Sequence, residues 1–207
     1  MTTPMLDPSK NSQSVHGKIK LITLDPGHFH AALVQKTMYP QIDKDVHVYA
    51  PESDDVKDHL NRINAYNQSA DNPTRWNEVV YTGADYFEKM LQEKKGNLVV
   101  IAGNNKRKTE YIEASVKAGL NVLADKPMAI DINAFQQLKE AFRLAKEKHV
   151  LIYDIMTERF EIASILQKEL MQISEVFGKL ETGTDDDPGV SMISKHYFYK
   201  FKIILYW

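Results

Sequence analysis

Short apolar runs rich in β-branched residues alternate along this chain with segments whose apolar residues have helical spacing. The runs expected to be strands are 19–24, 46–50, 78–81, 97–102, 121–124 and 150–153. The segments expected to be helices are 29–38, a stretch beginning near 54, 85–95, 106–118, a long stretch after Asp131, and 160–171. This alternation favours βαβ units and predicts an α/β protein with a doubly wound, Rossmann-like parallel sheet. Such a sheet binds its ligand at the carboxyl ends of the strands.

The composition limits the classes of function. The 207 residues include 26 Lys and Arg and 28 Asp and Glu, a net charge of −2, which gives no electrostatic case for binding nucleic acid or an anionic membrane. The sequence has no cysteine, which excludes disulfides, thiolate zinc sites and a cysteine nucleophile. Its apolar runs are far shorter than the about 20 residues of a membrane-spanning helix. We therefore expect a soluble, cytoplasmic protein.

Three parts are expected along the chain. Residues 1–17 are polar and lack periodicity, which predicts a flexible leader. Residues 18–156 are predicted to form a dinucleotide-binding, Rossmann-like domain. Residues 157–207 are predicted to be a hinge and the incomplete start of a second, α+β domain. The aromatic segment 197–207 is either a strand of that domain or a tail that replaced the proper sequence, because an exposed chain end this apolar would be sticky.

The turn after the first predicted strand, DPGHFHAA at 25–32, is the first candidate for a ligand site. A dinucleotide fingerprint has Gly-x-Gly-x-x-Gly here, so that the backbone can approach the pyrophosphate. Only the middle glycine, Gly27, is present, and Asp25 and His30 occupy the first and third positions. Asp25 brings a negative charge near the expected phosphates. The alternative interpretation is that Pro26 and Gly27 simply turn the chain.

His28 and His30 allow a second interpretation of this turn, as two ligands of a metal ion. Residues two apart on a helix point to different sides, and the sequence shows no recognisable third ligand. We therefore expect no metal here, and instead a polar contact or an imidazole that faces phosphate.

Two further positions are candidates because they follow predicted strands. Glu52 is the acid nearest the end of the second strand, where a carboxylate would hold the adenosine ribose, or it is a solvated acid in the first turn of a helix. Lys126, between Asp125 and Pro127, lies at the carboxyl end of a buried strand and faces the expected crevice. A lysine held there can bond a hydroxyl and stabilise charge during hydride transfer, although a surface lysine would have the same surroundings in sequence.

Two segments of the sequence resemble a known family. NLVVIAGNN at 97–105 and KAGLNVLADKPMAI at 117–130, with a helix between them, resemble the glucose–fructose oxidoreductase/inositol dehydrogenase (Gfo/Idh/MocA) family. MTERFEIASILQKEL, VFGKLETG and SKHYFYK look like the family's hinge into its C-terminal domain. The resemblance implies an NAD(P)-dependent oxidoreductase that acts on a sugar, cyclitol or related polyol.

The resemblance also implies roles for individual residues. Lys126 would be the catalytic lysine that reaches the cofactor ribose and the substrate hydroxyl, and Asp125 stands at the family's glutamate. Gly27 would lie under the pyrophosphate, and 102–105 would face the nicotinamide half. The full set of predicted cofactor-binding residues is Gly27, His28, Phe29, His30, Glu52, Ala102, Gly103, Asn104, Asn105, Asp125, Lys126 and Pro127. NAD is slightly favoured over NADP, because the Glu52 carboxylate would repel a 2′-phosphate.

The chain departs from the family pattern in three places. Two of the three glycines are missing, Lys108 stands where many members have histidine, and most of the second domain with its acid–base pair is absent. Three functions therefore stay open: the cofactor-binding part of a carbohydrate oxidoreductase, a non-catalytic nucleotide or small-ligand module, or a metal hydrolase at His28 and His30. The expected partner is a small-molecule substrate. Self-association is expected to be weak, because the family often assembles through its C-terminal domain.

Overall fold

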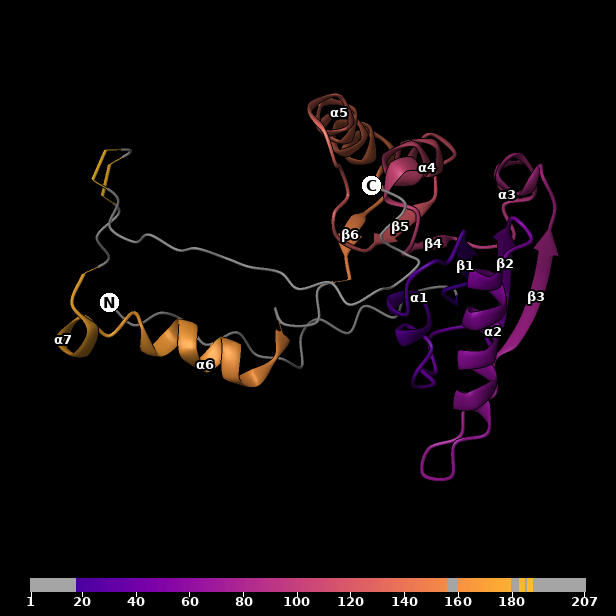
Figure 1. The fold of residues 1–207 in the computed structure, drawn as a ribbon, viewed down its shortest axis with the longest axis horizontal. Helices are drawn as coiled ribbons and strands as arrows, with labels where there is room; N and C mark the ends of the chain where they lie inside the picture. The colour runs from indigo at the N-terminus through magenta and orange to yellow at the C-terminus, as the bar shows by residue number, and fades with distance from the viewer. Residues whose placement is uncertain (1–17, 156–159, 180–182, 185, 188–207) are drawn as a thin grey trace.

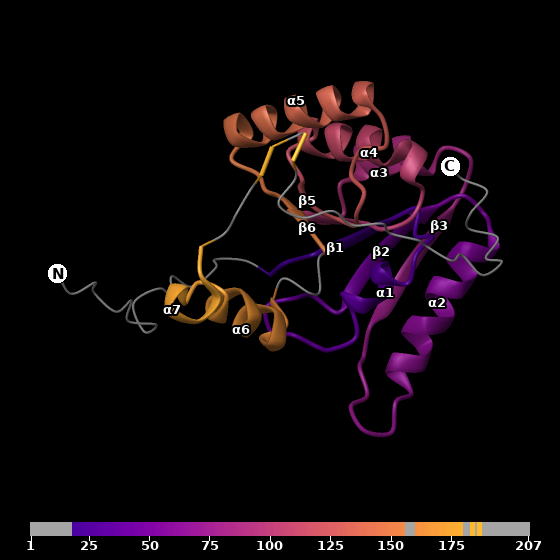
Figure 2. The same ribbon diagram turned by 60° about the vertical axis from the view of Figure 1, so that its left-hand side comes forward.

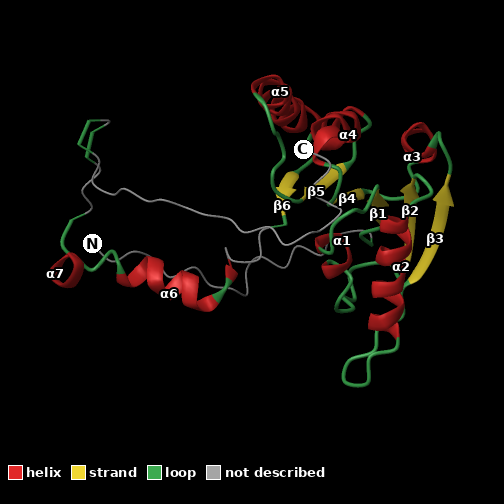
Figure 3. Ribbon diagram, viewed as in Figure 1, coloured by secondary structure: helices red, strands yellow, loops and turns green. Residues whose placement is uncertain are grey.

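The computed structural model describes residues 18–155, 160–179, 183–184 and 186–187. Within them, six strands form one sheet: β1 (Leu21–Leu24), β2 (Asp45–Ala50), β3 (Asn77–Thr82), β4 (Leu98–Ile101), β5 (Asn121–Ala124) and β6 (Ile152–Asp154). Their order is β3-β2-β1-β4-β5-β6, and every neighbouring pair is parallel (Figures 1 and 3). The predicted Rossmann-like α/β sheet is confirmed. The predicted leader at 1–17 and the aromatic segment 197–207 lie outside the described residues.

Helices cover both faces of this sheet (Figure 2). One face carries α3 (Tyr86–Glu93), α4 (Asn105–Lys117) and α5 (Ile132–Lys148), and the other carries α1 (His30–Leu33) and α2 (Asp54–Asn67). Two more helices, α6 (Ile162–Leu170) and α7 (Ser174–Phe177), follow the sheet and bury none of their side chains. No helix in the described part of the chain is long and apolar enough to cross a membrane.

Each face of the sheet has its own hydrophobic core. Successive strand residues point to opposite faces, so a strand buried on both sides contributes to two cores. In β1, Leu21 belongs to the core with α1 and α2, whereas Ile22 belongs to the core with α3, α4 and α5. In β4, Val100 belongs to the core with α1 and α2, and Val99 belongs to the core with α3, α4 and α5. This double burial explains why these strands are uniformly apolar rather than alternating.

Helix boundaries follow local signals in several places. The Ser53 hydroxyl accepts the N–H of Val56 at the start of α2, and the Asp131 carboxylate accepts the N–H of Ala134 at the start of α5. Gly119 follows α4 with a φ of +81°, a conformation that glycine adopts without strain. The predicted starts of α2 and α5 and the predicted end of α4 are confirmed.

One other predicted feature is wrong. The helix expected at 29–38 spans only four residues in α1, because the chain turns directly after it, with the N–H of Gln35 bonded to the carbonyl of Ala32. The segment 65–76 begins inside α2, continues as a mostly exposed loop and ends on Trp76, which is only 4% exposed. Its indole N–H donates to the Gln35 carbonyl at 2.5 Å, and this bond with the buried ring attaches the end of the segment to the core.

The end of α3 also differs from the prediction. Lys94, with a φ of +46°, caps the helix after Glu93, whereas the helix was expected to reach residue 95. Gly96 follows, and a Cβ built there would lie 2.5 Å from the carbonyl oxygen of Lys20. The glycine allows the chain to pass close to the start of β1.

The strand order places a crevice between β1 and β4. The chain leaves β1 toward α1 on one face and leaves β4 toward α4 on the other face. Strand connections that diverge in this way open a ligand site at the carboxyl ends of the two strands. The two loops touch at their base, where Pro26 and Gly103 form an isolated antiparallel bridge.

Candidate functional site

A cavity of about 390 Å³ opens at the carboxyl ends of the strands, between the loops that follow β1, β2, β4 and β5. This volume lies within the range of small-molecule sites. The lining residues are Asp25, Gly27, His28, Pro51, Ser53, Asp55, Tyr86, Gly103, Asn104, Asn105, Arg107, Asp125, Lys126 and Pro127. The cavity therefore lies where the order of the strands predicts a ligand.

Most of the residues predicted from the sequence meet at this cavity. Those that line it are Gly27, His28, Gly103, Asn104, Asn105, Asp125, Lys126 and Pro127. The other four lie outside the lining set. Phe29 is 46% exposed and Glu52 is also exposed, whereas Ala102 is fully buried and His30 turns its ring toward Asp125.

The loop after β1 is tied together by its own backbone. The N–H groups of Gly27 and His28 both donate to the carbonyl of Ala102, at 3.0 and 3.1 Å. Asp25 takes a positive φ of 45°, where a dinucleotide fingerprint has its first glycine. Its carboxylate accepts the hydroxyl of Tyr111 at 2.8 Å and the side-chain amide of Asn104 at 3.3 Å. The carboxylate thus fixes the turn and remains at the wall of the cavity.

Gly103, in the loop after β4, is the residue that lets the two loops approach. A Cβ built on it would lie 2.4 Å from the Gly27 nitrogen and 2.7 Å from the Asp25 carbonyl oxygen. A Cβ on Gly27 would meet the Cα of Gly103 at 3.3 Å, a much milder contact. The strict requirement for glycine at this crevice therefore falls on the β4 loop. The sequence signal for it was the match of 102–105 to the family turn.

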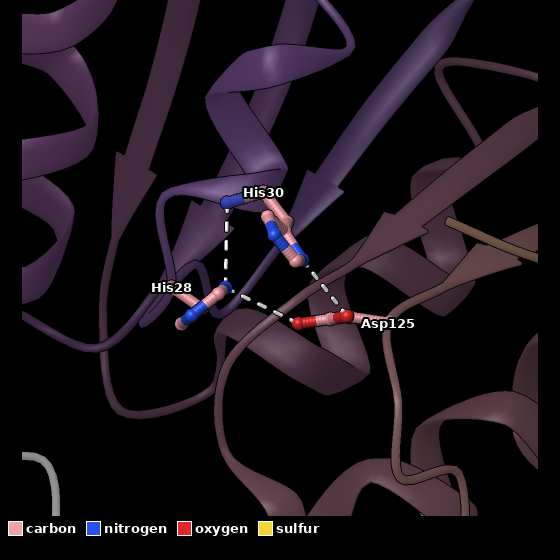
Figure 4. A group of neighbouring side chains, drawn as sticks. All are labelled: His28, His30 and Asp125. Carbon is pink, nitrogen blue, oxygen red and sulfur yellow. Dashed lines mark hydrogen bonds and ion pairs between the residues drawn. The ribbon is translucent and has the colours of Figure 1, made fainter. Parts of the chain in front are cut away.

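His28, His30 and Asp125 form a compact cluster beside the cavity (Figure 4). The Nδ1 atom of His28 lies 3.2 Å from Oδ2 of Asp125, and the Nδ1 atom of His30 lies 3.0 Å from Oδ1. Asp125 is 3% exposed. Burial raises the pKa of its carboxyl, but the contacts with His28 and His30 outweigh burial and hold that pKa at about 2. The sequence alone shows no partner for the two histidines, and the fold supplies Asp125 from the residue that follows β5.

Lys108 is a second buried charge close to Asp125. It is fully buried in α4, and its ammonium donates to Oδ1 of Asn105 at 2.8 Å and to the carbonyl of Lys126 at 3.5 Å. Burial lowers the pKa of Lys108 from 10.5 to about 8, and the negative charge of Asp125 opposes that change. The departure from the family histidine thus places a cation behind the loop that carries Lys126.

Arg107 and Tyr86 also line the cavity, and the sequence alone gave no indication of either. The guanidinium of Arg107 donates to the Tyr86 hydroxyl at 2.8 Å and to both carboxylate oxygens of Glu110 at 2.9 Å. The Tyr86 hydroxyl lies 2.5 Å from the Tyr111 hydroxyl, which in turn donates to the Asp25 carboxylate. This chain of contacts links a cation on α4 to the carboxylate of the β1 loop. Only the packing of α3 against α4 brings these side chains together.

Asp55, not Glu52, places an acid at the cavity after β2. It lies in the first turn of α2, and its Oδ2 atom would be 3.6 Å from a Cβ built on Gly27. Burial and then the charge of Asp25 raise the pKa of Asp55. The run of acids at 52–55 is the sequence signal for this position, but it does not show which carboxylate faces inward. The cavity therefore combines glycine backbone, carboxylates and the cations Arg107 and Lys126.

The comparisons with known proteins agree with this geometry. Residues 26–155 match the family model GFO_IDH_MocA, described as "Oxidoreductase family, NAD-binding Rossmann fold". Residues 166–203 match a second model, the C-terminal domain Oxidoreduct_C. No curated protein matches the sequence.

Solved structures show the same fold. A protein from Parabacteroides merdae, described as a "putative oxidoreductase", has a sequence 59% identical to this chain and a crystal structure that matches it with a TM-score of 0.80. The match covers 83% of this chain and 39% of the Parabacteroides chain. GenD2 from gentamicin A biosynthesis, in complex with NAD, is 18% identical with a TM-score of 0.56, covering 77% and 40%. Scyllo-inositol dehydrogenase from Lactobacillus casei, with bound NAD(H) and scyllo-inositol, is 16% identical with a TM-score of 0.53, covering 77% and 42%. The chain spans about two fifths of the length of these solved relatives.

Proposed function

The chain belongs to the Gfo/Idh/MocA oxidoreductase family with an NAD-binding Rossmann fold, and from this premise we propose that it binds a nicotinamide dinucleotide in the cavity. The proposed reaction is hydride transfer to or from a carbon that bears a hydroxyl group, on a sugar, cyclitol or related polyol. The observation that carries the proposal is that Lys126 lines the same cavity as Gly27 and Gly103. A hydroxyl-binding cation and a closely approachable backbone are the two things such a reaction needs.

The residues at the cavity fit this cofactor. Gly103 lets the loops after β1 and β4 pack against each other without a side chain between them, and both Gly27 and Gly103 line the cavity. Arg107 and Lys126 line the cavity and offer positive charge for phosphates, and α4 begins there at Asn105. Asp55 offers a carboxylate for ribose hydroxyls, and it would repel a 2′-phosphate. The preference for NAD over NADP, expected from Glu52, is therefore proposed for Asp55.

A bound nicotinamide supplies the hydride or accepts it. In this scheme the Lys126 ammonium donates to the substrate oxygen and stabilises the negative charge that develops on it. The Lys126 backbone N–H donates to Oδ1 of Asp125 at 2.8 Å, and this bond fixes the backbone from which the Lys126 side chain extends. Asp125 and Pro127 position Lys126, while Lys108 holds its carbonyl.

The matched regions also support the division of the chain. We infer that 18–156 is the dinucleotide unit and that 157–207 belongs to the start of the second domain, since the two family models match 26–155 and 166–203. The absence of cysteine supports a reducing compartment such as the cytoplasm.

One observation favours a second candidate, a module that binds a small ligand without turnover. The N–H groups of Gly27 and His28, which could otherwise meet a pyrophosphate, are bonded to Ala102, and Asp25 adds a negative charge beside them. A ligand without a diphosphate fits this loop as well as a dinucleotide does.

Calorimetric titration with NAD(H) and NADP(H) tests the proposed function. We expect the full chain to bind NAD(H) more tightly than NADP(H), and Lys126→Ala to weaken binding. Lys139→Ala, which removes an exposed lysine from α5, is the matched control and should bind like the unchanged chain. A folded sample that shows neither heat nor a thermal shift with either cofactor would exclude the dinucleotide and leave the small-ligand module. A coupled assay with polyols then separates binding from turnover.

A further inference from the structure

Two imidazoles and one carboxylate, from loops that are far apart in the sequence, converge at His28, His30 and Asp125 (Figure 4). One ligand atom from each side chain lies within 4.8 Å of the others. The Nδ1 atom of His28 lies 3.2 Å from Oδ2 of Asp125 and the Nδ1 atom of His30 lies 3.0 Å from Oδ1, so each pair of atoms must open slightly to admit an ion. Around a tetrahedral ion with bonds of about 2.0–2.2 Å, neighbouring ligand atoms lie about 3.3–3.6 Å apart. We propose that this cluster binds a divalent transition-metal ion, and that Zn²⁺ is the ion it prefers.

The three side chains are held in place before any ion binds. The backbone of His28 is fixed by its bond to Ala102, and the Asp125 N–H donates to the carbonyl of Ile101 at 2.8 Å. The His28 and His30 rings meet edge to face, with centroids 4.3 Å apart. Both rings point at one carboxylate in Figure 4. A preformed set of ligands costs little conformational entropy when the ion enters.

Hydrogen bonding alone satisfies the cluster poorly at His28. Its Nδ1 atom lies 3.4 Å from the backbone N–H of His30 and 3.2 Å from Oδ2 of Asp125. One ring nitrogen either carries a proton and donates or lacks a proton and accepts, so it cannot satisfy both neighbours. With the proton, it donates to Asp125 and leaves the His30 N–H without this acceptor; without the proton, its lone pair faces a carboxylate oxygen. A cation between nitrogen and oxygen turns that repulsion into two favourable contacts.

The types of donor atom point to the class of ion. Two imidazole nitrogens with one carboxylate oxygen suit Zn²⁺ and other borderline transition metals, whereas Mg²⁺ and Ca²⁺ prefer oxygen ligands throughout. Three protein ligands also leave a tetrahedral ion with one open position, as in catalytic sites.

The open position of the ion would face the cavity. The side chains of Asp125 and His30 are 4% and 16% exposed, while that of His28 is 31% exposed and lines the cavity. An ion held there would present its free position on the side of His28, where a hydroxyl or carboxylate oxygen of a small ligand can complete the coordination. The cluster thus defines a second binding element in the same cavity, and it does not depend on a dinucleotide.

Metal content and zinc affinity of the full chain test the proposal directly. The chain is purified without chelator for elemental analysis, then stripped and titrated with Zn²⁺ by calorimetry in the absence of nucleotide. Co²⁺ substitution adds the visible spectrum of the bound ion as a readout of its coordination. The variants are His28→Gln, His30→Gln and Asp125→Asn, with His149→Asn as the control because His149 is exposed at the end of α5.

We expect one Zn²⁺ per chain, a loss of at least about tenfold in affinity for each cluster variant, and a change within about twofold for His149→Asn. A folded chain that takes up no stoichiometric ion overturns the proposal, and so do cluster variants that bind zinc as well as the unchanged chain. If a buried member of the cluster is needed for folding, His28→Gln decides, because His28 is the most exposed of the three. Dinucleotide titration in the presence of chelator keeps the two proposals separate, since either can fail alone.

Discussion

The loop after β1 forms one wall of the cavity, the loops after β4 and β5 form a second wall, and the two walls use their polar groups differently. In the first wall, the N–H groups of Gly27 and His28 are bonded to the protein itself, and Asp25 carries a negative charge. In the second wall, the cations Arg107 and Lys126 line the cavity, and the Arg107 guanidinium is also paired with Glu110. A typical dinucleotide site binds phosphate with the first wall. Here the groups that suit an anion lie in the second wall.

The largest effect is expected from breaking the contact between the walls. Gly103→Ala places a Cβ about 2.4 Å from the Gly27 nitrogen, against backbone that cannot rotate away. We expect a loss of about 3 kcal/mol in the free energy of unfolding, at the upper end of the range for overpacking. Urea denaturation followed by circular dichroism measures it. Gly27→Ala, with its milder 3.3 Å contact, should cost clearly less. Equal losses in the two variants would contradict the asymmetry between the loops.

The next effect concerns the buried cation behind the second wall. The pKa of Lys108 falls from 10.5 in the unfolded chain to about 8 in the fold, so the unfolded chain binds more protons between those values. Stability should therefore rise with pH from about 8 to 10.5, and the cost of burying the charge is complete below pH 8. Lys108→Met should remove this rise, which is about 3 kcal/mol at 1.36 kcal/mol per pKa unit.

Urea denaturation at several pH values, with the unchanged chain and Lys108→Met compared at each, isolates this contribution from other titrating groups. Lys117→Met, on the exposed surface of the same helix, is the control and should run parallel to the unchanged chain. A difference between Lys108→Met and the unchanged chain that stays constant from pH 7 to about 10 would show that Lys108 does not change its charge on folding.

A somewhat smaller effect is expected at Asp125, whose charge stabilises the fold, whereas the charge of Lys108 destabilises it. The contacts with His28 and His30 hold its pKa at about 2, below the usual value of 3.8, so its carboxylate stabilises the fold above pH 4. That contribution is lost as the pH falls through the folded pKa near 2. Asp125→Asn keeps the shape and should cost about 2 kcal/mol at pH 6, with the difference shrinking toward pH 2. Asp58→Asn, an exposed acid in α2, serves as the control in the same acid titration. Parallel acid curves for the unchanged chain and Asp125→Asn would contradict the depressed pKa.

The sequence predicted the sheet because parallel strands buried on both faces read as continuous apolar runs, as in 97–102. It also predicted the helix starts near residue 54 and after Asp131, because the residues that cap these helices, Ser53 and Asp131, are local signals. It failed for the helix at 29–38, where Trp76 reaches across to bond the Gln35 carbonyl. That contact joins residues about forty positions apart, and no periodicity within the helix reveals it.

The candidate site divides in the same way. The sequence located Gly27, Lys126 and the family turn at 102–105, because each lies directly after a predicted strand. It argued against a metal because no third ligand lies near the histidines in sequence, whereas Asp125 reaches them from two strands away in the sheet. Arg107 was also missed, since its place at the cavity depends on the packing of α3 and α4. Site residues that directly follow a strand could be predicted from the sequence, whereas contacts between residues on distant strands or helices could not.

The smallest effect should distinguish the two acids that follow β2. Asp55 lines the cavity and has a pKa raised by burial and by Asp25, whereas Glu52 is exposed outside it. Asp55→Asn removes the carboxylate that would repel a 2′-phosphate, so NADP(H) binding should tighten by up to about tenfold, or about 1.4 kcal/mol. Glu52→Gln removes the same charge a few residues away and should leave the NAD(H) to NADP(H) ratio unchanged. Calorimetric titration of both variants with both cofactors gives the two ratios. A shift with Glu52→Gln alone would return cofactor selection to the residue that the sequence favoured, and would place the ribose outside the wall that Asp55 lines.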